Sequence, residues 1–106
     1  MTFGQIITRA RKGKNLSQRK LASLIKKEDG HPISAPYIND IEHGRCIPAS
    51  DHLIEQFSKT LGIKPEVLYF VTRRFPPDLY VEPANEKLIV AAIKECRKVL
   101  RGRARG

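Results

Sequence analysis

The sequence has few cysteines and few aromatic rings, and it lacks a long hydrophobic run. Cys46 and Cys96 form no CxxC pair or other zinc-ligand spacing, and we expect neither a metal nor a disulfide. Aromatic residues make up 7% of the chain and offer no stacking platform for single-stranded nucleic acid, which disfavours RNA. No apolar run approaches the roughly 18 residues of a membrane span, so we expect no membrane partner.

The sequence also lacks the residue patterns of an enzyme. His31, His43 and His52 do not follow a metal-ligand spacing, and no Ser/His/Asp or paired-carboxylate arrangement is evident. We therefore predict no catalytic residue, no metal ligand and no cofactor. The first residues lack the basic-then-apolar pattern of a secretion signal, so we expect a cytoplasmic protein. A length of 106 residues predicts one small domain with an appendage, and hydrophobic content of 41% with charged content of 29% is typical of a folded protein.

Positive charge is what the sequence has in excess. Twenty Lys and Arg outnumber eleven Asp and Glu, and the formal charge is +9. Residues 1–27 carry no acid and eight basic side chains: Arg9, Arg11, Lys12, Lys14, Arg19, Lys20, Lys26 and Lys27. A second basic cluster lies near the C-terminus: Lys94, Arg97, Lys98, Arg101, Arg103 and Arg105. Such clusters favour polyanions because binding releases their counterions, although many basic surfaces are only solvated.

Apolar residues recur at helical spacing and predict an all-α fold. Thr2 and Gln5 have the spacing of a capping box. Farther along the chain, Gly or Pro residues mark where the expected helices begin or end. We expect helices from Phe3 to Gly13, Ser17 to Glu28, near Ser34 to Gly44, Ser50 to Gly62, Pro65 to about Thr72 and Asn85 to about Leu100. The sequence leaves open whether Ser34 or Ala35 caps the third helix. It divides into a five-helix domain over residues 1–72, an irregular linker over 73–84, and an amphipathic helix with a frayed basic tail over 85–106.

The segment from Leu16 to Pro48 carries the most specific pattern. It contains Leu16-Ser17-Gln18-x-x-Leu21-Ala22, then Ile33-Ser34, then Ile38-x-x-Ile41-Glu42-x-Gly44-Arg45, and Leu61-Gly62-Ile63 follows later. Together these resemble the helix-turn-helix of the phage Cro/repressor (Xre-like) transcription-factor family, over roughly residues 3–72. The resemblance implies a compact five-helix, lambda-repressor-like DNA-binding domain, usually a dimer on a palindromic operator. It also implies that Glu42 is structural and pairs with a basic residue, for which Arg9 and Arg11 are the candidates.

The resemblance places a DNA-contacting surface on the second and third helices. The second helix would approach a phosphate through Gln18, next to its cap Ser17. The third helix would lie in the major groove, while Ile38 and Ile41 face the core. The residues predicted to contact DNA are Lys14, Ser17, Gln18, Arg19, Ser34, Ala35, Pro36, Tyr37, Asn39, Asp40 and Arg45.

Three of these residues have two interpretations each. Asn39 either bridges adenine N6 and N7 or holds a phosphate. Tyr37 either contacts a phosphate, sugar or base, or packs half-buried against the turn. Asp40 either accepts from cytosine N4 or only orients Arg45, which itself is expected to meet a phosphate.

The sequence departs from the family pattern in two places. Ala35 and Pro36 stand where polar residues are common, which favours shape readout or apolar contacts such as Ala35 against a thymine methyl group. The turn between the second and third helices, Lys26 to Pro32, is about six residues longer than the tight family turn. This extension either lengthens the second helix and projects Lys26 and Lys27 toward the DNA backbone or is a solvated loop.

The last expected helix has one continuous apolar stripe, which is more than a lone exposed helix should carry. It either pairs with the same helix of a second copy or packs on the fifth helix of its own chain, and we favour the homodimer. The residues expected at this dimer contact are Leu88, Ile89, Ala92, Ile93 and Cys96.

Two functions are consistent with these observations. The first is a sequence-specific, double-stranded DNA-binding transcriptional regulator, expected to be a dimeric repressor. The second is an antitoxin-like or accessory protein that binds a partner protein and regulates its own operon.

Overall fold

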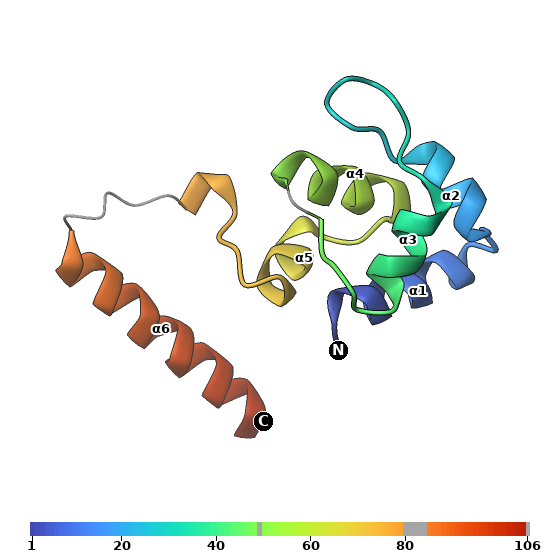
Figure 1. Ribbon diagram of the computed structural model, residues 1–106. Helices are drawn as coiled ribbons and strands as arrows, with labels where there is room; N and C mark the ends of the chain where they lie inside the picture. Colours follow the sequence, from blue (N-terminus) through green and yellow to red (C-terminus); the bar gives the residue numbers. More distant parts are fainter. Residues whose placement is uncertain (49, 80–84, 106) are drawn as a thin grey trace.

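The structure, a computed structural model, describes residues 1–48, 50–79 and 85–105, the last three by their backbone. Its helices are α1 (Phe3–Gly13), α2 (Gln18–Leu24), α3 (Ala35–Glu42), α4 (Asp51–Leu61), α5 (Pro65–Val71), the 3₁₀ turn η1 (Pro77–Leu79) and α6 (Glu86–Arg105) (Figure 1). An antiparallel bridge between Lys26 and Pro32 is the one β pairing in the described part of the chain. The predicted all-α class is therefore confirmed.

The apolar stripes of α1 to α5 converge on one core. In it, α3 contacts both α1 and α2, and α4 contacts both α1 and α5. The ring of Phe3 packs edge-on against that of Phe57, with 5.8 Å between centroids, and joins α1 to α4. Each large apolar side chain buried in this way contributes about 1.5–3 kcal/mol to folding. The buried apolar residues are Phe3, Ile7, Leu21, Ala22, Ile25, Ile33, Ile38, Ile41, Leu53, Ile54, Phe57, Leu61, Leu68 and Tyr69.

Helix starts follow the signals in the sequence. The Thr2 hydroxyl accepts from the Gln5 N–H, and the Gln5 side chain accepts from the Thr2 N–H, so the predicted capping box is confirmed. Ser17, Ser34 and Ser50 each accept a hydrogen bond from the N–H three residues on. The cap of α3 is therefore Ser34, because its oxygen satisfies an N–H that would otherwise lack a partner in the first turn.

Helix α2 is shorter than predicted. It ends at Leu24 rather than Glu28, because Ile25 adopts an extended conformation that buries its side chain fully. The Ile33 N–H then donates to the Ile25 carbonyl over 3.0 Å and starts a hairpin-like excursion over residues 26–32. The lengthened second helix was therefore a wrong expectation. Leu24, which the helical spacing of Leu21 and Ile25 would place on the inner side, is 40% exposed.

The excursion over residues 26–32, which we call the α2–α3 hairpin, is attached to α4 (Figure 1). The Lys26 N–H donates to Gln56 Oε1 over 3.1 Å, and Nε2 of the half-buried His52 lies 2.9 Å from the Lys26 carbonyl. The Ser50 hydroxyl donates to Glu28 over 3.0 Å. The hairpin is thus held by specific hydrogen bonds and is not a loop that is merely solvated.

Helix α5 and the segment after it differ in detail from the prediction. Leu68 and Tyr69 are buried, whereas the apolar side chains of Val67 and Phe70 are 43% and 65% exposed. The predicted irregular linker contains the short η1 turn. Its residues 80–84 lie outside the described residues.

Helix α6 begins where the sequence predicted. The Asn85 side chain accepts from the Leu88 N–H over 3.2 Å and caps the helix. The helix extends to Arg105 and not only to about Leu100. The expected frayed tail was therefore wrong for residues 102–105, which are helical. Gly106 is not among the described residues.

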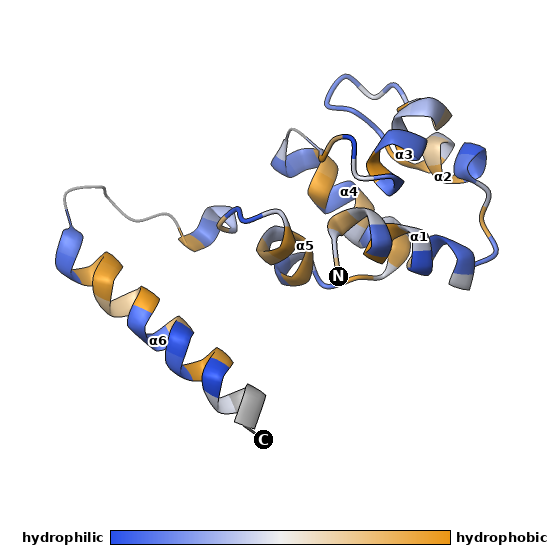
Figure 2. Ribbon diagram, turned by 60° about the horizontal axis from the view of Figure 1, so that its bottom comes forward, coloured by the Kyte–Doolittle hydropathy of each residue, from blue (hydrophilic) through white to orange (hydrophobic). Residues whose placement is uncertain are grey.

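Nearly all of α6 is exposed, apolar side included. Of the side chains from 86 to 102, only that of Ile93 is partly buried. Figure 2 shows the hydrophobic side of α6 uncovered, and Figure 1 shows the helix set apart from the five-helix domain. Cys96, one of the residues expected at the dimer contact, is exposed in the single chain, and its thiol is free. No described helix combines the length and the apolar character needed to cross a membrane.

Candidate nucleic-acid interface

The inner side of α3 is fixed by apolar burial and by close packing on α1. Ile38 and Ile41 are 0% and 1% exposed. At Gly4 the backbones approach so closely that a Cβ there would meet the Ile41 carbonyl oxygen and lie 2.8 Å from that of Glu42. Only glycine therefore permits this approach of α1 to α3. The sequence analysis missed Gly4, although a glycine inside the first turn of a capped helix is a signal of close backbone contact.

The end of α3 is tied to α1 by a largely buried ion pair. Arg11 Nε donates to Glu42 Oε2 over 2.7 Å, and Arg11 Nη2 donates to Glu42 Oε1 over 3.0 Å. The third donor, Nη1, reaches the Leu16 carbonyl over 2.8 Å. The Arg11 and Glu42 side chains are 11% and 4% exposed. Glu42 thus pairs with a basic residue of the domain, as expected, and this residue is Arg11 and not Arg9.

This pair changes the proton affinity of both groups. Burial alone would raise the pKa of the Glu42 carboxyl, but the hydrogen bonds from Arg11 and Gln18 outweigh it, so the pKa lies below its ordinary value. The hydrogen bond to Glu42 likewise raises the pKa of Arg11. Glu42 is therefore a charged structural group at neutral pH.

Gln18 connects the two helices of the helix-turn-helix. Its amide nitrogen donates to Glu42 Oε1 over 3.0 Å and to Asn39 Oδ1 over 3.3 Å. The sequence analysis did not anticipate this bridge, since it depends on the crossing of α2 and α3. The predicted phosphate contact of Gln18 stays a prediction. The bridge leaves the amide nitrogen of Asn39 without a partner among the described residues, and its oxygen keeps a second lone pair.

The outer side of α3 is uncovered by the described part of the chain. Ser34 and Pro36 are exposed, and Asn39 is partly exposed. Tyr37 is partly buried against the core, which agrees with the half-buried alternative for this side chain. The partly buried positions of this side of α3 are Ala35, Tyr37, Asn39 and Asp40.

Asp40 holds the Arg45 side chain at the end of this surface. Arg45 Nη1 donates to Asp40 Oδ1 over 3.1 Å, with side chains 59% and 47% exposed. A pair this exposed contributes at most about 1 kcal/mol, so Arg45 is free to exchange its partner for a phosphate. Of the two interpretations of Asp40, the structure thus contains the one in which Asp40 orients the Arg45 side chain.

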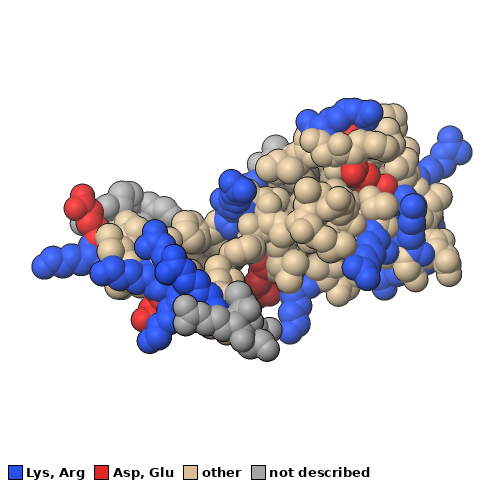
Figure 3. All heavy atoms as spheres, turned by 90° about the horizontal axis from the view of Figure 1, so that it is seen from below, with Lys and Arg blue, Asp and Glu red and all other residues tan. Residues whose placement is uncertain are grey.

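Figure 3 shows basic side chains at several places on one face of the five-helix domain and along its edges. Lys14 and Arg19 are exposed beside the start of α2, as is Ser17. The residues predicted to contact DNA from α2 and α3 therefore come from adjacent helices that pack on each other. No cluster of three or more potential metal ligands occurs in the part of the chain that the structure describes.

A chain of the SinR protein/SinI protein complex shares this fold. The two chains superpose with a TM-score of 0.52 and are 23% identical, over 96% of this chain and 94% of the other. At this identity the likeness concerns the fold, and its coverage includes α6 as well as the five-helix domain. No family model and no curated protein matches the sequence.

Proposed function

We propose that the protein is a sequence-specific regulator of transcription that binds duplex DNA through α3 and acts as a homodimer. The observation that carries the proposal is a short helix held rigidly from behind while its outer side is uncovered. Ile38, Ile41 and Glu42 hold the helix, and Gln18 joins it to α2. The major groove, about 12 Å wide, accepts an α-helix presented in this way.

The outer residues divide into two chemical classes. Asn39 has a free amide nitrogen and a second lone pair on its oxygen, which is the donor and acceptor set that pairs with adenine N6 and N7. Lys14, Arg19 and Arg45 are exposed cations that suit phosphates. Ala35 offers only an apolar contact to a thymine methyl group. We infer that direct base readout is limited to few positions and that DNA shape contributes to specificity.

Selection of bound sequences from a pool of random duplexes tests the proposal. The expected result is a two-fold-symmetric motif with half-sites about 10 base pairs apart. Asn39→Ala should relax the preference at one or two positions by roughly 1–3 kcal/mol each. Lys64→Ala, an exposed change before α5, is the control and should leave the motif unchanged. Absence of any enriched motif would contradict the proposal.

The dimer part of the proposal is supported by the exposed apolar side of α6. Leu88 and Ile89 are 51% and 39% exposed, an unfavourable state that a second copy would relieve. The expected contact residues on this side remain Leu88, Ile89, Ala92, Ile93 and Cys96.

Sedimentation of matched variants tests the dimer. The double variant Leu88→Asp/Ile93→Asp should be a folded monomer with weaker operator binding. Ala91→Asp/Lys94→Asp, which places the same groups on the other side of α6, should remain a dimer. An unchanged assembly of the first variant would reject the α6 dimer, and so would loss of the five-helix fold.

A second candidate function is the capture of a partner protein, with regulation of its own operon. Beyond α6, the phenyl rings of Phe70 and Phe75 are 65% and 71% exposed, and such rings often mark protein contacts. Co-expression with the product of a neighbouring gene tests this function. A stable complex that is lost in Phe70→Ser/Phe75→Ser would support it, whereas a symmetric DNA motif with no such complex favours the regulator alone.

A further inference from the structure

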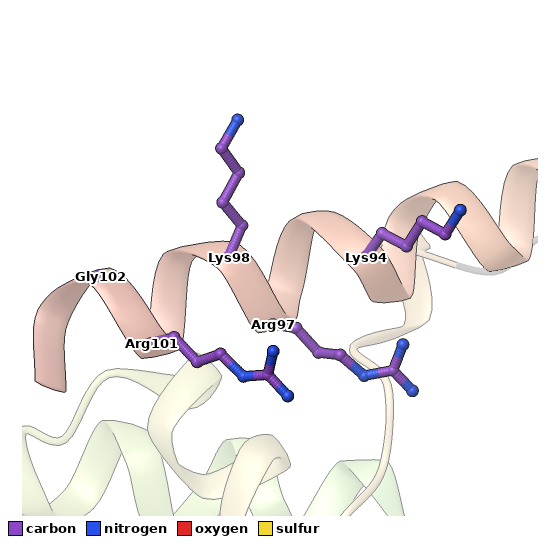
Figure 4. A pocket seen from close by; sticks show the side chains of 5 residues that line it. All are labelled: Lys94, Arg97, Lys98, Arg101 and Gly102. Carbon is purple, nitrogen blue, oxygen red and sulfur yellow. The ribbon is translucent and has the colours of Figure 1, made fainter.

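The polar side of α6 carries a row of basic side chains, which we call the α6 basic face: Lys94, Arg97, Lys98 and Arg101. Their spacing of three and four residues places them on adjacent turns of one side of the helix. None of them forms an ion pair or hydrogen bond with another described residue. Together with Gly102 they line an open hollow along the helix (Figure 4).

The shape of the α6 basic face favours an extended anion over a small one. Every residue that lines the hollow comes from α6, so no second element closes over it. In Figure 4, Arg97 and Arg101 extend side by side with their guanidinium groups turned the same way, while Lys98 leaves the helix in another direction. Seven residues of helix span about 10 Å, and duplex DNA carries one negative charge per roughly 1.7 Å of axis. Several phosphates therefore lie within reach of these four cations.

The position of the basic face disfavours an anionic membrane. At about 100° per residue, Lys94 and Arg101 lie roughly opposite Ala92, Cys96 and Val99. Figure 2 shows the same separation of hydrophilic and hydrophobic sides along α6. A helix that buried its apolar side in lipid would point most of these cations away from the headgroups. A helix whose apolar side is covered by a second copy would instead leave the basic face outermost.

We propose that the α6 basic face binds the phosphate backbone of duplex DNA outside the region contacted by α3, without regard to sequence; this rests on the proposed function. Arg97 and Arg101 each present planar N–H donors that match phosphate oxygens, and Lys94 and Lys98 add point charges. The contact raises affinity for all duplexes and lengthens the stretch of DNA that the dimer covers.

Salt titrations of DNA binding by the full chain test this proposal. The variant Arg97→Gln/Lys98→Gln/Arg101→Gln removes three cations while keeping good helix formers. The control Lys59→Gln/Lys64→Gln/Arg73→Gln removes three exposed cations from the five-helix domain and its C-terminal end. Both are measured on one random-sequence duplex of 40 base pairs and on the selected site, between 50 and 200 mM salt.

The α6 variant should reduce the slope of log affinity against log salt by about 2.7 for each protomer whose α6 contacts the duplex, since each phosphate contact contributes about 0.9. For each such protomer, the loss of affinity over this fourfold salt range should be roughly 40-fold smaller than in the wild type. The control should change the slope by less than one unit. Both variants should select the same motif as the wild type, because the α6 contact carries no sequence information.

Other outcomes separate the two proposals. A slope for the α6 variant equal to that of the control overturns the α6 contact and leaves the proposed regulator intact. Absence of a selected motif, with the slope difference present, overturns the regulator and leaves non-specific binding by α6. Binding of the wild type, but not of the α6 variant, to vesicles with one third phosphatidylserine, together with equal DNA slopes, would assign the face to membranes and overturn the proposal.

Discussion

Replacing Glu42 by Leu should destabilise the protein more than any surface substitution, because it leaves a buried cation without its partner. The Arg11 guanidinium, whose side chain is 11% exposed, would keep only the Leu16 carbonyl as acceptor. Gln18 would lose its bond to the carboxylate as well. Removal of one member of a buried pair costs about 3–5 kcal/mol, of the roughly 5–15 kcal/mol that a domain has in total.

Urea denaturation of a double-mutant cycle measures this cost. We expect Glu42→Leu and Arg11→Met each to lower the free energy of unfolding by about 3 kcal/mol. The double variant should come within about 1–2 kcal/mol of the wild type, since two apolar side chains of similar length replace both charges. A loss below 1 kcal/mol for Glu42→Leu, or additive losses in the double variant, would refute the reasoning.

The same pair predicts how stability depends on acid. The pKa of Glu42 is lowered in the folded state, so its contribution is complete above the unfolded value of about 4.3 and is lost as the pH falls through the lower folded value. The wild type should therefore lose stability steeply below about pH 4, and Arg11→Met/Glu42→Leu less steeply. Parallel unfolding curves for both proteins between pH 6 and pH 3 would contradict this.

Three further predictions concern other parts of the chain. Gly4→Ala should cost about 2–3 kcal/mol in thermal or urea unfolding, because its methyl group meets backbone atoms of α3, whereas Gly13→Ala, with open space around it, should be neutral or slightly stabilising. Burial and the hydrogen bond to Glu55 raise the pKa of Tyr69 to about 12. The contribution of Tyr69 to the free energy of unfolding should thus be complete below pH 10 and fall by about 2 kcal/mol as the pH rises to 12. This fall should be absent in Tyr69→Phe. Arg45→Ala should weaken binding to all duplexes alike and reduce the salt slope by about one unit for each bound protomer, and a loss confined to some sequences would reject its phosphate role.

Helices whose ends carry local chemical signals were predictable from the sequence. The capping box at Thr2 and the side chain of Ser50 each accept a hydrogen bond from a backbone N–H three residues on. Gly62 ends α4 by adopting the left-handed conformation. The Asn85 side chain likewise accepts from the Leu88 N–H at the start of α6. A regular helix repeats every 3.6 residues, and this repeat alone puts the apolar Leu53, Ile54, Phe57 and Leu61 on one side of α4, where all four are buried.

The features that sequence analysis missed depend on residues distant in the chain. The end of α2 at Leu24 is decided by burial of Ile25 and by the contact of Lys26 with Gln56 in α4, which helix periodicity within α2 does not contain. The bridge from Gln18 to Asn39 requires the crossing of two helices. In α5, periodicity alone did not distinguish the buried Tyr69 from its exposed neighbour Phe70.

The sequence indicated which positions lie on the candidate DNA surface. It did not indicate which atoms of their side chains already have hydrogen-bond partners. The pattern placed Asn39 and Arg45 on one outer side, and the structure adds which of their atoms are engaged. The Asn39 oxygen already accepts from Gln18, and Arg45 already donates to Asp40. Under the proposed function, contact with DNA would use the remaining donors and lone pairs or exchange the exposed partner, and only coordinates reveal that constraint.

Amide chemical-shift mapping of the chain with a duplex that carries the selected site tests most directly whether α3 enters the groove. The account predicts the largest shifts at residues 34–40 of α3 and its cap and in the first turn of α2, at Gln18 and Arg19. Unchanged amides in α3 while those of α5 or the α2–α3 hairpin shift on binding would contradict it.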